Sequence, residues 1–196
     1  MMKNSCIAIV VALSQHSRGY RTGGALKLAD TVRHIVSILL QNEAGALARV
    51  ANLFSTRGYN IESLNVAPTH DDTVSRLTLV TNGSETVMDQ IIKQLGKLVD
   101  VVNIIDMTDD DHIERELALF KIQMPGDDWE PLARTAREFG ATVLDDREGH
   151  FTVELTGGSG EIDRFVAAIS ARAQMLTVVR SGAMAVARGA PILTPT

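Results

Sequence analysis

The stretch that decides the fold runs over residues 34–69 and reads HIVSILLQNEAGALARVANLFSTRGYNIESLNVAPT. It opens with an apolar run at residues 34–40, which is typical of a strand covered on at least one face. A polar break at residues 41–45 follows. Apolar residues then recur at the i, i+3, i+4, i+7 spacing from Leu47, which predicts a helix with one buried face. Residues 61–67 alternate as a second strand.

The residues beyond this stretch complete one βαββαβ unit. Residues 74–81 alternate between apolar and polar side chains and predict a third strand. A second helix is expected over residues 84–98, where apolar residues recur every three or four positions. Residues 101–107 supply a last strand. The expected order is therefore strand, helix, strand, strand, helix, strand.

A second copy of this order follows along the chain. Its expected strand, helix, hairpin, helix and closing strand lie at residues 117–124, 129–139, 141–156, 162–169 and 175–179. Two copies of one pattern support each other. The predicted fold class is α+β, with two tandem ferredoxin-like βαββαβ units whose antiparallel sheets carry both helices on one face. The other sheet face and the edge strands are expected to be open, and therefore to pair with a second copy of the chain.

The pattern divides the chain into four segments. Residues 1–33 form an N-terminal extension that we expect to be poorly ordered, because its apolar part at residues 6–13 leads into a polar, glycine-containing stretch. Residues 34–108 form the first domain and residues 109–190 the second. Residues 191–196 are left as a tail.

Composition and charge argue against several classes of function. The 196 residues carry a formal net charge of −5 and no basic run, which disfavours a nucleic-acid partner. No apolar run approaches transmembrane length, so no membrane partner is expected. The single cysteine, Cys6, allows neither a disulfide within the chain nor a cysteine-based zinc site, and it suits a cytoplasmic location.

A search for catalytic and metal-binding residues yields few candidates. The five histidines lie far apart, and none forms a pair with helical metal-ligand spacing. Residues 109–112, three aspartates and a histidine, are either a cation site or a solvated linker, and the linker is favoured. The glycine-rich residues 157–160 lack the Lys and Ser/Thr of a phosphate-binding loop. No nucleophile, base and oxyanion donor can be assembled, so we expect no catalytic residue, no metal site and no enzyme activity of the chain alone.

The polar break at residues 41–47, QNEAGAL, is the stretch most suited to binding a ligand. Gly45 would let backbone N–H groups at a helix N-terminus approach an anion such as a carboxylate. The side-chain amide of Asn42 can accept from an ammonium group and donate to a carboxylate. Together these groups could hold an α-amino acid. A capped helix entry with Asn42 in a turn explains the same residues equally well.

These residues also resemble a known family. The stretch from Gln41 to Thr69 resembles the first half of an ACT domain, and more narrowly the regulatory (small) subunit of acetolactate synthase. The segment RGYNIESL at Arg57–Leu64 is the most specific part. The resemblance continues through Glu114–Leu117 and ends near Arg180–Gly182 and Arg188–Gly189, and so covers residues 34–189. The helix expected at residues 129–139 matches less well.

The resemblance implies a regulatory role in branched-chain amino-acid biosynthesis. Such subunits bind and activate a large catalytic subunit that depends on thiamine diphosphate, and they confer feedback inhibition, usually by valine. Thiamine diphosphate, Mg and FAD are expected on that partner, and the chain would have no cofactor of its own. The effector lies between the ACT domains of a homodimer. The implied effector-binding residues are Asn42, Gly45, Ala46 and Leu47 of one copy with Asn60 and Ile61 of the other.

A second interpretation is a stand-alone amino-acid-sensing ACT module that regulates another partner, such as a transcription regulator. Residues 1–33 show neither a helix-turn-helix pattern nor a basic surface, which disfavours it. The sequence leaves open whether valine, leucine or isoleucine is the preferred effector.

Overall fold

The computed structural model of the chain describes residues 11–12, 32–124, 129–189 and 193–194. Its contacts divide the chain into two compact units. The first unit holds the residues up to Ile113 together with those from Ala185 onward, and the second unit is Glu114–Met184. Most of the extension expected at residues 1–33 lies outside the described residues, as do all but two residues of the tail.

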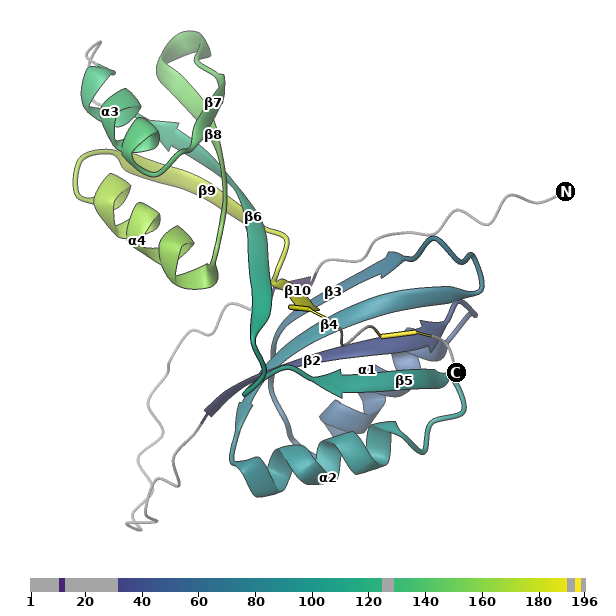
Figure 1. Ribbon diagram of the computed structural model, residues 1–196. Helices are drawn as coiled ribbons and strands as arrows, with labels where there is room; N and C mark the ends of the chain where they lie inside the picture. Colours follow the sequence, from purple (N-terminus) through teal and green to yellow (C-terminus); the bar gives the residue numbers. More distant parts are fainter. Residues whose placement is uncertain (1–10, 13–31, 125–128, 190–192, 195–196) are drawn as a thin grey trace, which may run out of the picture. The chain divides into compact units, whose positions relative to one another are not determined.

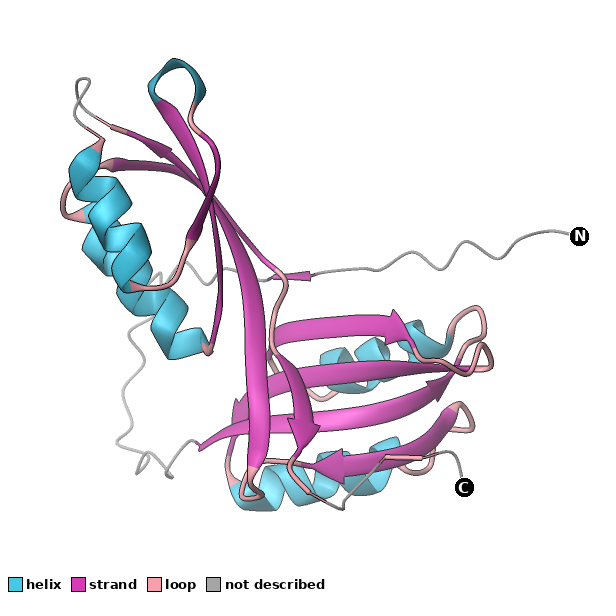
Figure 2. Cartoon of the chain, turned by 45° about the horizontal axis from the view of Figure 1, so that its top comes forward, coloured by secondary structure: helices cyan, strands magenta, loops and turns pink. Residues whose placement is uncertain are grey.

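The first unit is a five-stranded antiparallel sheet with two helices on one face (Figures 1 and 2). Its elements are β1 (Val11–Ala12), β2 (Val32–Gln41), α1 (Ala46–Thr56), β3 (Ile61–Pro68), β4 (Val74–Gly83), α2 (Glu85–Leu95) and β5 (Val101–Asp106). The strand order is β1-β3-β4-β2-β5. From β2 onward this is the predicted βαββαβ order.

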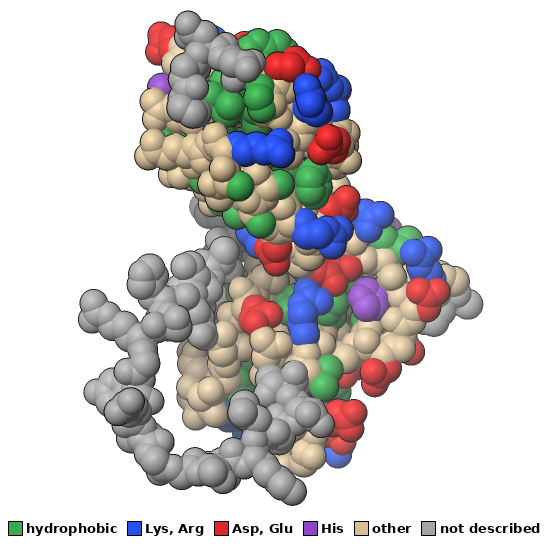
Figure 3. Space-filling view, turned by 90° about the vertical axis from the view of Figure 1, so that its left-hand side faces the viewer, with side chains coloured by type: hydrophobic (Ala, Val, Ile, Leu, Met, Phe, Trp, Pro, Cys, Tyr) green, Lys and Arg blue, Asp and Glu red, His purple; other side chains and the backbone are tan. Residues whose placement is uncertain are grey.

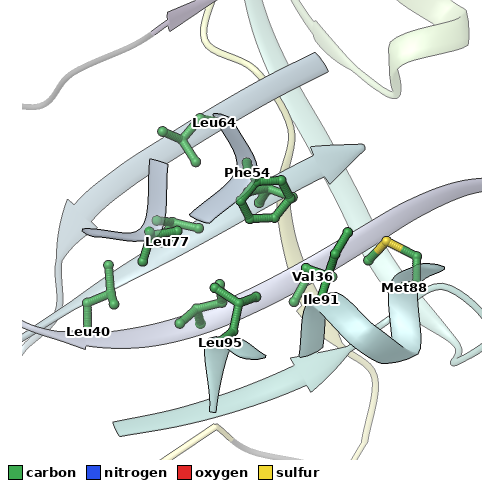
Figure 4. Packing of buried hydrophobic residues seen from close by; sticks show 11 residues of the cluster. Val36, Leu40, Phe54, Leu64, Leu77, Met88, Ile91 and Leu95 are labelled. Carbon is green, nitrogen blue, oxygen red and sulfur yellow. The ribbon is translucent and has the colours of Figure 1, made fainter. Parts of the chain in front are cut away.

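Alternate residues of the central strands form the core of this unit. Val36, Ile38 and Leu40 of β2 point to the helix side and are almost fully buried. Phe54 of α1 and Ile91 of α2 pack against them (Figure 4). Every second residue of the strand faces the helices, and every third or fourth residue of each helix faces the sheet. These side chains together form a single apolar layer.

The second face of this sheet is not open, contrary to expectation. Ile35, Ser37 and Leu39 of β2 point to that face and are all at most 3% exposed. Arg76 and Asn103 both lie opposite Leu39 in the register. The Arg76 side chain donates to the carbonyl oxygen of Leu193 at 3.3 Å, and that of Asn103 donates to Thr194 at 3.0 Å. The C-terminal residues of the same chain therefore cover part of this face.

The second unit repeats the arrangement. Its elements are β6 (His112–Gln123), α3 (Glu130–Glu138), β7 (Thr142–Asp145), η1 (Arg147–Gly149), β8 (His150–Gly157), α4 (Ser159–Ser170) and β9 (Gln174–Arg180), and β10 (Met184–Ala187) lies beside β6. β6 pairs with both β8 and β9, and β7 pairs with β8, all antiparallel. Phe120, Val153 and Phe165 form the centre of its core. The predicted class, α+β with two ferredoxin-like units, is confirmed.

The division into units differs from the expected domain boundaries at both ends of the second domain. That domain is expected at residues 109–190, whereas residues 109–113 and the described residues from 185 onward group with the first unit. The backbone N–H of Arg188 donates to the carbonyl of Asp111 at 2.9 Å, and the two side chains form an ion pair at 3.1 Å. These contacts attach the residues after β10 to the first unit. A repeated pattern of strands and helices does not predict that the end of the second copy packs on the first.

Candidate functional site

The loop between β2 and α1 has the backbone of an anion-binding turn. Gly45 is the N-cap of α1, and its φ of 91° is a left-handed conformation that favours glycine. Within the described ranges, no side chain caps the helix. Among the described residues, the backbone N–H groups of Gly45, Leu47 and Ala48 have no hydrogen-bond partner. They are the unpaired donors of a helix N-terminus, and they surround the glycine.

Asn42 braces this loop against the turn between β3 and β4. Its backbone N–H donates to Thr73 at 2.8 Å, and its side-chain amide donates to the carbonyl of Asp72 at 3.0 Å. The hydroxyl of Ser75 donates to its side-chain oxygen at 3.3 Å. Asn42 thus takes the turn-forming role that the sequence left open.

The remaining candidate residues lie at the other end of the sheet. Ile61, which begins β3, pairs with Thr81, and Thr81 pairs with His34. Asn42 lies eight residues after His34, immediately beyond the end of β2 at Gln41. At about 3.3 Å per residue this separates the two groups by roughly 26 Å along the sheet. The structure therefore brings Asn42, Gly45, Ala46 and Leu47 together and keeps Asn60 and Ile61 away from them within one copy.

Arg49 and Asp100 form an ion pair beside the loop that sequence reasoning missed. Asp100 is 2% exposed, and Nε and Nη2 of Arg49 donate to its two carboxylate oxygens. The hydrogen bonds from Arg49 hold the pKa of Asp100 below its ordinary value, and those to Asp100 raise the pKa of Arg49. Sequence reasoning could have found Arg49, because it lies four residues after Gly45 and therefore on the same side of the helix. Asp100 lies 51 residues further on and gives no local signal.

The second unit has a polar network of its own. Nε and Nη2 of Arg180 donate to the two oxygens of Glu116 at 2.9 and 2.7 Å, and Nη1 donates to Asp163 at 2.7 Å. The backbone N–H of Gly182 also donates to Glu116, at 3.2 Å. Glu116 is 4% exposed. The structure thus joins two stretches that carry the family resemblance, at residues 114–117 and 180–182.

The other candidate sites show ordinary contacts. Asp111 pairs with Arg188, and the ring Nδ1 of His112 lies 2.8 Å from the carbonyl oxygen of Asp110. Within the described ranges, no group of three His, Cys, Asp or Glu side chains is placed to hold a metal ion. No helix among those residues is long and apolar enough to cross a membrane. On the face in Figure 3, acidic and basic side chains are interspersed.

The fold and the loop define the class of the first unit. A βαββαβ sheet with a glycine turn between its first strand and first helix is the architecture of an ACT domain. Residues 36–103 match the sequence model described as the AHAS small subunit-like ACT domain. Residues 115–189 match a second model, described as the small subunit of acetolactate synthase.

Individual relatives agree with both models. The chain is 47% identical over 162 residues to the acetolactate synthase isozyme 3 small subunit of Escherichia coli, covering 83% of this chain and 99% of that one. It is 42% identical to the acetolactate synthase small subunit of Haemophilus influenzae, covering 81% and 97%. The crystal structure of the acetolactate synthase small subunit from Thermotoga maritima superposes with a TM-score of 0.72 at 30% identity, covering 81% and 99%. The chain belongs to the acetolactate synthase small subunit family.

Proposed function

We propose that this chain is the regulatory subunit of a cytoplasmic acetolactate synthase. It binds the catalytic subunit, raises its activity and makes it sensitive to valine. Family membership across both units carries this proposal. Thiamine diphosphate, Mg and FAD belong to the catalytic partner in this scheme, and the chain contributes no catalytic residue.

The chemistry of the Gly45 loop supports an amino-acid effector. The unpaired N–H groups of Gly45, Leu47 and Ala48 suit a carboxylate, and the positive end of the α1 dipole favours the same group. Leu47 and Ile61 are both half-buried and would supply apolar surface. Burying an aliphatic side chain such as that of valine contributes roughly 1.5 to 3 kcal/mol.

The geometry of a single copy supports a site shared between two. Asn60 and Ile61 lie roughly 26 Å along the sheet from Asn42 of the same chain, at about 3.3 Å per residue. A ligand the size of valine cannot touch both groups unless a second copy supplies one of them. We therefore propose that the effector lies between the first units of a homodimer.

The test combines activity, inhibition and size. The purified chain alone should form no acetolactate from pyruvate, and adding it to the catalytic subunit should raise turnover and allow inhibition by valine. Light scattering should show at least a dimer at micromolar concentration. Acetolactate formation by the chain alone, or failure to bind the catalytic subunit, would refute the regulatory role. A monomer both with and without valine would refute the shared site.

A further inference from the structure

The side chain of Arg49 leans over the glycine of the loop. Arg49 stands one helical turn after Gly45, and its backbone N–H donates to the Gly45 carbonyl at 3.0 Å. Helical side chains slope toward the N-terminus of their helix. A Cβ atom added at Gly45 would lie 3.2 Å from Nη1 of Arg49. The guanidinium group therefore borders the same space as the unpaired N–H groups.

Asp100 holds this guanidinium in place. Its carboxylate is almost fully buried and binds Nε and Nη2 in the two-pronged geometry that suits arginine. Its backbone carbonyl accepts from the N–H of Gln41 at 2.8 Å, immediately before Asn42. One buried residue thus fixes both the start of the loop and the cation above it.

The pairing leaves one edge of Arg49 for a ligand. The described contacts of its guanidinium use Nε and Nη2 only, so both hydrogens of Nη1 remain available beside Gly45. The Arg49 side chain is 46% exposed, so a solute can reach it. The exposed carboxylate of Glu43 acts on the same guanidinium. A zwitterion, which offers an ammonium group as well as a carboxylate, suits this pair of opposite charges better than a simple anion.

We propose that Arg49 recognises the carboxylate of the amino-acid effector through Nη1, and that Asp100 is the residue that positions it. The inference rests on the proposed function, since it concerns the same loop. It adds a side-chain donor to a site otherwise built from backbone N–H groups. It also assigns specificity, because a ligand that lacks the carboxylate loses the contact with Arg49.

The experiment compares two ligands on the full chain. L-Valine and L-valinamide share a side chain and an ammonium group, and only valine has a carboxylate. Calorimetric titration of the chain without the catalytic subunit should show that the wild type prefers valine. Arg49→Met should weaken valine binding by about ten- to a hundredfold, the effect of one charge-assisted hydrogen bond, and change valinamide binding by less than about twofold.

The second ligand separates recognition from structure. A purely structural role for Arg49 would lower the affinity for both ligands equally, and that result would overturn the inference. Asp100→Asn should reduce the preference for valine less than Arg49→Met, because the guanidinium is present but no longer held. An unchanged preference in Asp100→Asn would overturn the positioning role. If Arg49→Met fails to fold, Arg49→Lys offers the same comparison, because lysine keeps a charge but lacks the planar fork.

Arg180→Met is the matched control, because Arg180 pairs in the same two-pronged way with the buried Glu116 of the second unit. It should leave the preference for valine unchanged. A wild type that binds neither ligand would refute the effector site as a whole. A wild type that prefers valine, with the preference intact in Arg49→Met, would refute only the role of Arg49.

Discussion

The two units share a strand order but enter their first helix differently. In the first unit β2 ends at Gln41 and α1 begins at Ala46, with the left-handed Gly45 as N-cap. In the second unit the N-cap of α3 is Trp129, which has right-handed backbone angles, and a proline lies in the first turn. Proline removes a backbone donor. The first unit thus enters its first helix through a left-handed glycine, whereas the second enters through a right-handed tryptophan and has one backbone donor fewer in the first turn.

The arginine–carboxylate pairs of the two units differ in how many of the arginine's donors are used. Arg180 has Glu116 and Asp163 as partners, and Gly182 completes the network, so its donors are largely used. Among the described residues, the guanidinium of Arg49 donates hydrogen bonds to Asp100 alone, and its side chain is 46% exposed. The network around Arg180 fixes the end of β9 in the second unit. Arg49, in the first unit, keeps donors that face the Gly45 loop. We therefore assign binding to the first unit and a structural role to the network in the second unit.

The strongest test of this comparison removes one core aromatic residue from each unit. Phe54→Ala and Phe165→Ala each delete a fully buried ring, and each should cost about 3 to 5 kcal/mol of unfolding free energy. Trp129 is the only tryptophan, and it belongs to the second unit. In urea, its fluorescence transition should shift in Phe165→Ala and stay unchanged in Phe54→Ala. Equal shifts in both variants would show that the units unfold as one.

The next test places the same charge on a glycine in each unit. Gly45 and Gly140 both have positive φ, so Gly45→Asp and Gly140→Asp carry a similar strain of roughly 1 to 2 kcal/mol. A Cβ at Gly140 meets nothing within 4 Å, whereas one at Gly45 meets Arg49. The new carboxylate at Gly45 would compete with Asp100 for Arg49. It would also repel the effector carboxylate by about 1 to 4 kcal/mol at about 4 Å.

Inhibition curves with the catalytic subunit measure the outcome of this pair. Gly45→Asp should abolish inhibition by valine, and Gly140→Asp should retain it. Both variants should still activate the catalytic subunit. Wild-type sensitivity in Gly45→Asp, with the subunits still bound to each other, would place the effector elsewhere.

The smallest expected effect is a pH dependence that differs between the units. Arg49 lowers the pKa of Asp100 from 3.8, so this carboxylate stabilises the folded state above pH 3.8, and the contribution is lost as the pH falls through the folded pKa. Arg147 lowers the pKa of Asp145 in the second unit in the same way. Asp100→Asn should make the unfolding free energy of the first unit fall less steeply as the pH is lowered. Asp145→Asn should have the same effect on the second unit. Urea unfolding followed by circular dichroism and by Trp129 fluorescence, between about pH 6 and pH 3, separates the two effects. An unchanged slope in Asp100→Asn would contradict the ion pair.

The sequence by itself determined the two βαββαβ units and the position of the Gly45 loop. The helix expected from Leu47 is found at Ala46–Thr56, and the strand expected at residues 34–40 is found at Val32–Gln41. These features depend on periodicity and turn chemistry within a few residues, so a local pattern contains them. The family resemblance likewise rested on contiguous segments.

Only the tertiary structure decided which distant groups meet at the loop. Asp100 reaches Arg49 across 51 residues, and Ser75 reaches Asn42 across 33. On the second face of the sheet, Arg76 donates to Leu193, which lies 117 residues further along the chain. The strand register likewise separates Ile61 from Asn42 within one copy. Such contacts follow from how strands pair and helices pack. A local sequence pattern is compatible with many pairings, and the packing of the whole unit selects one of them.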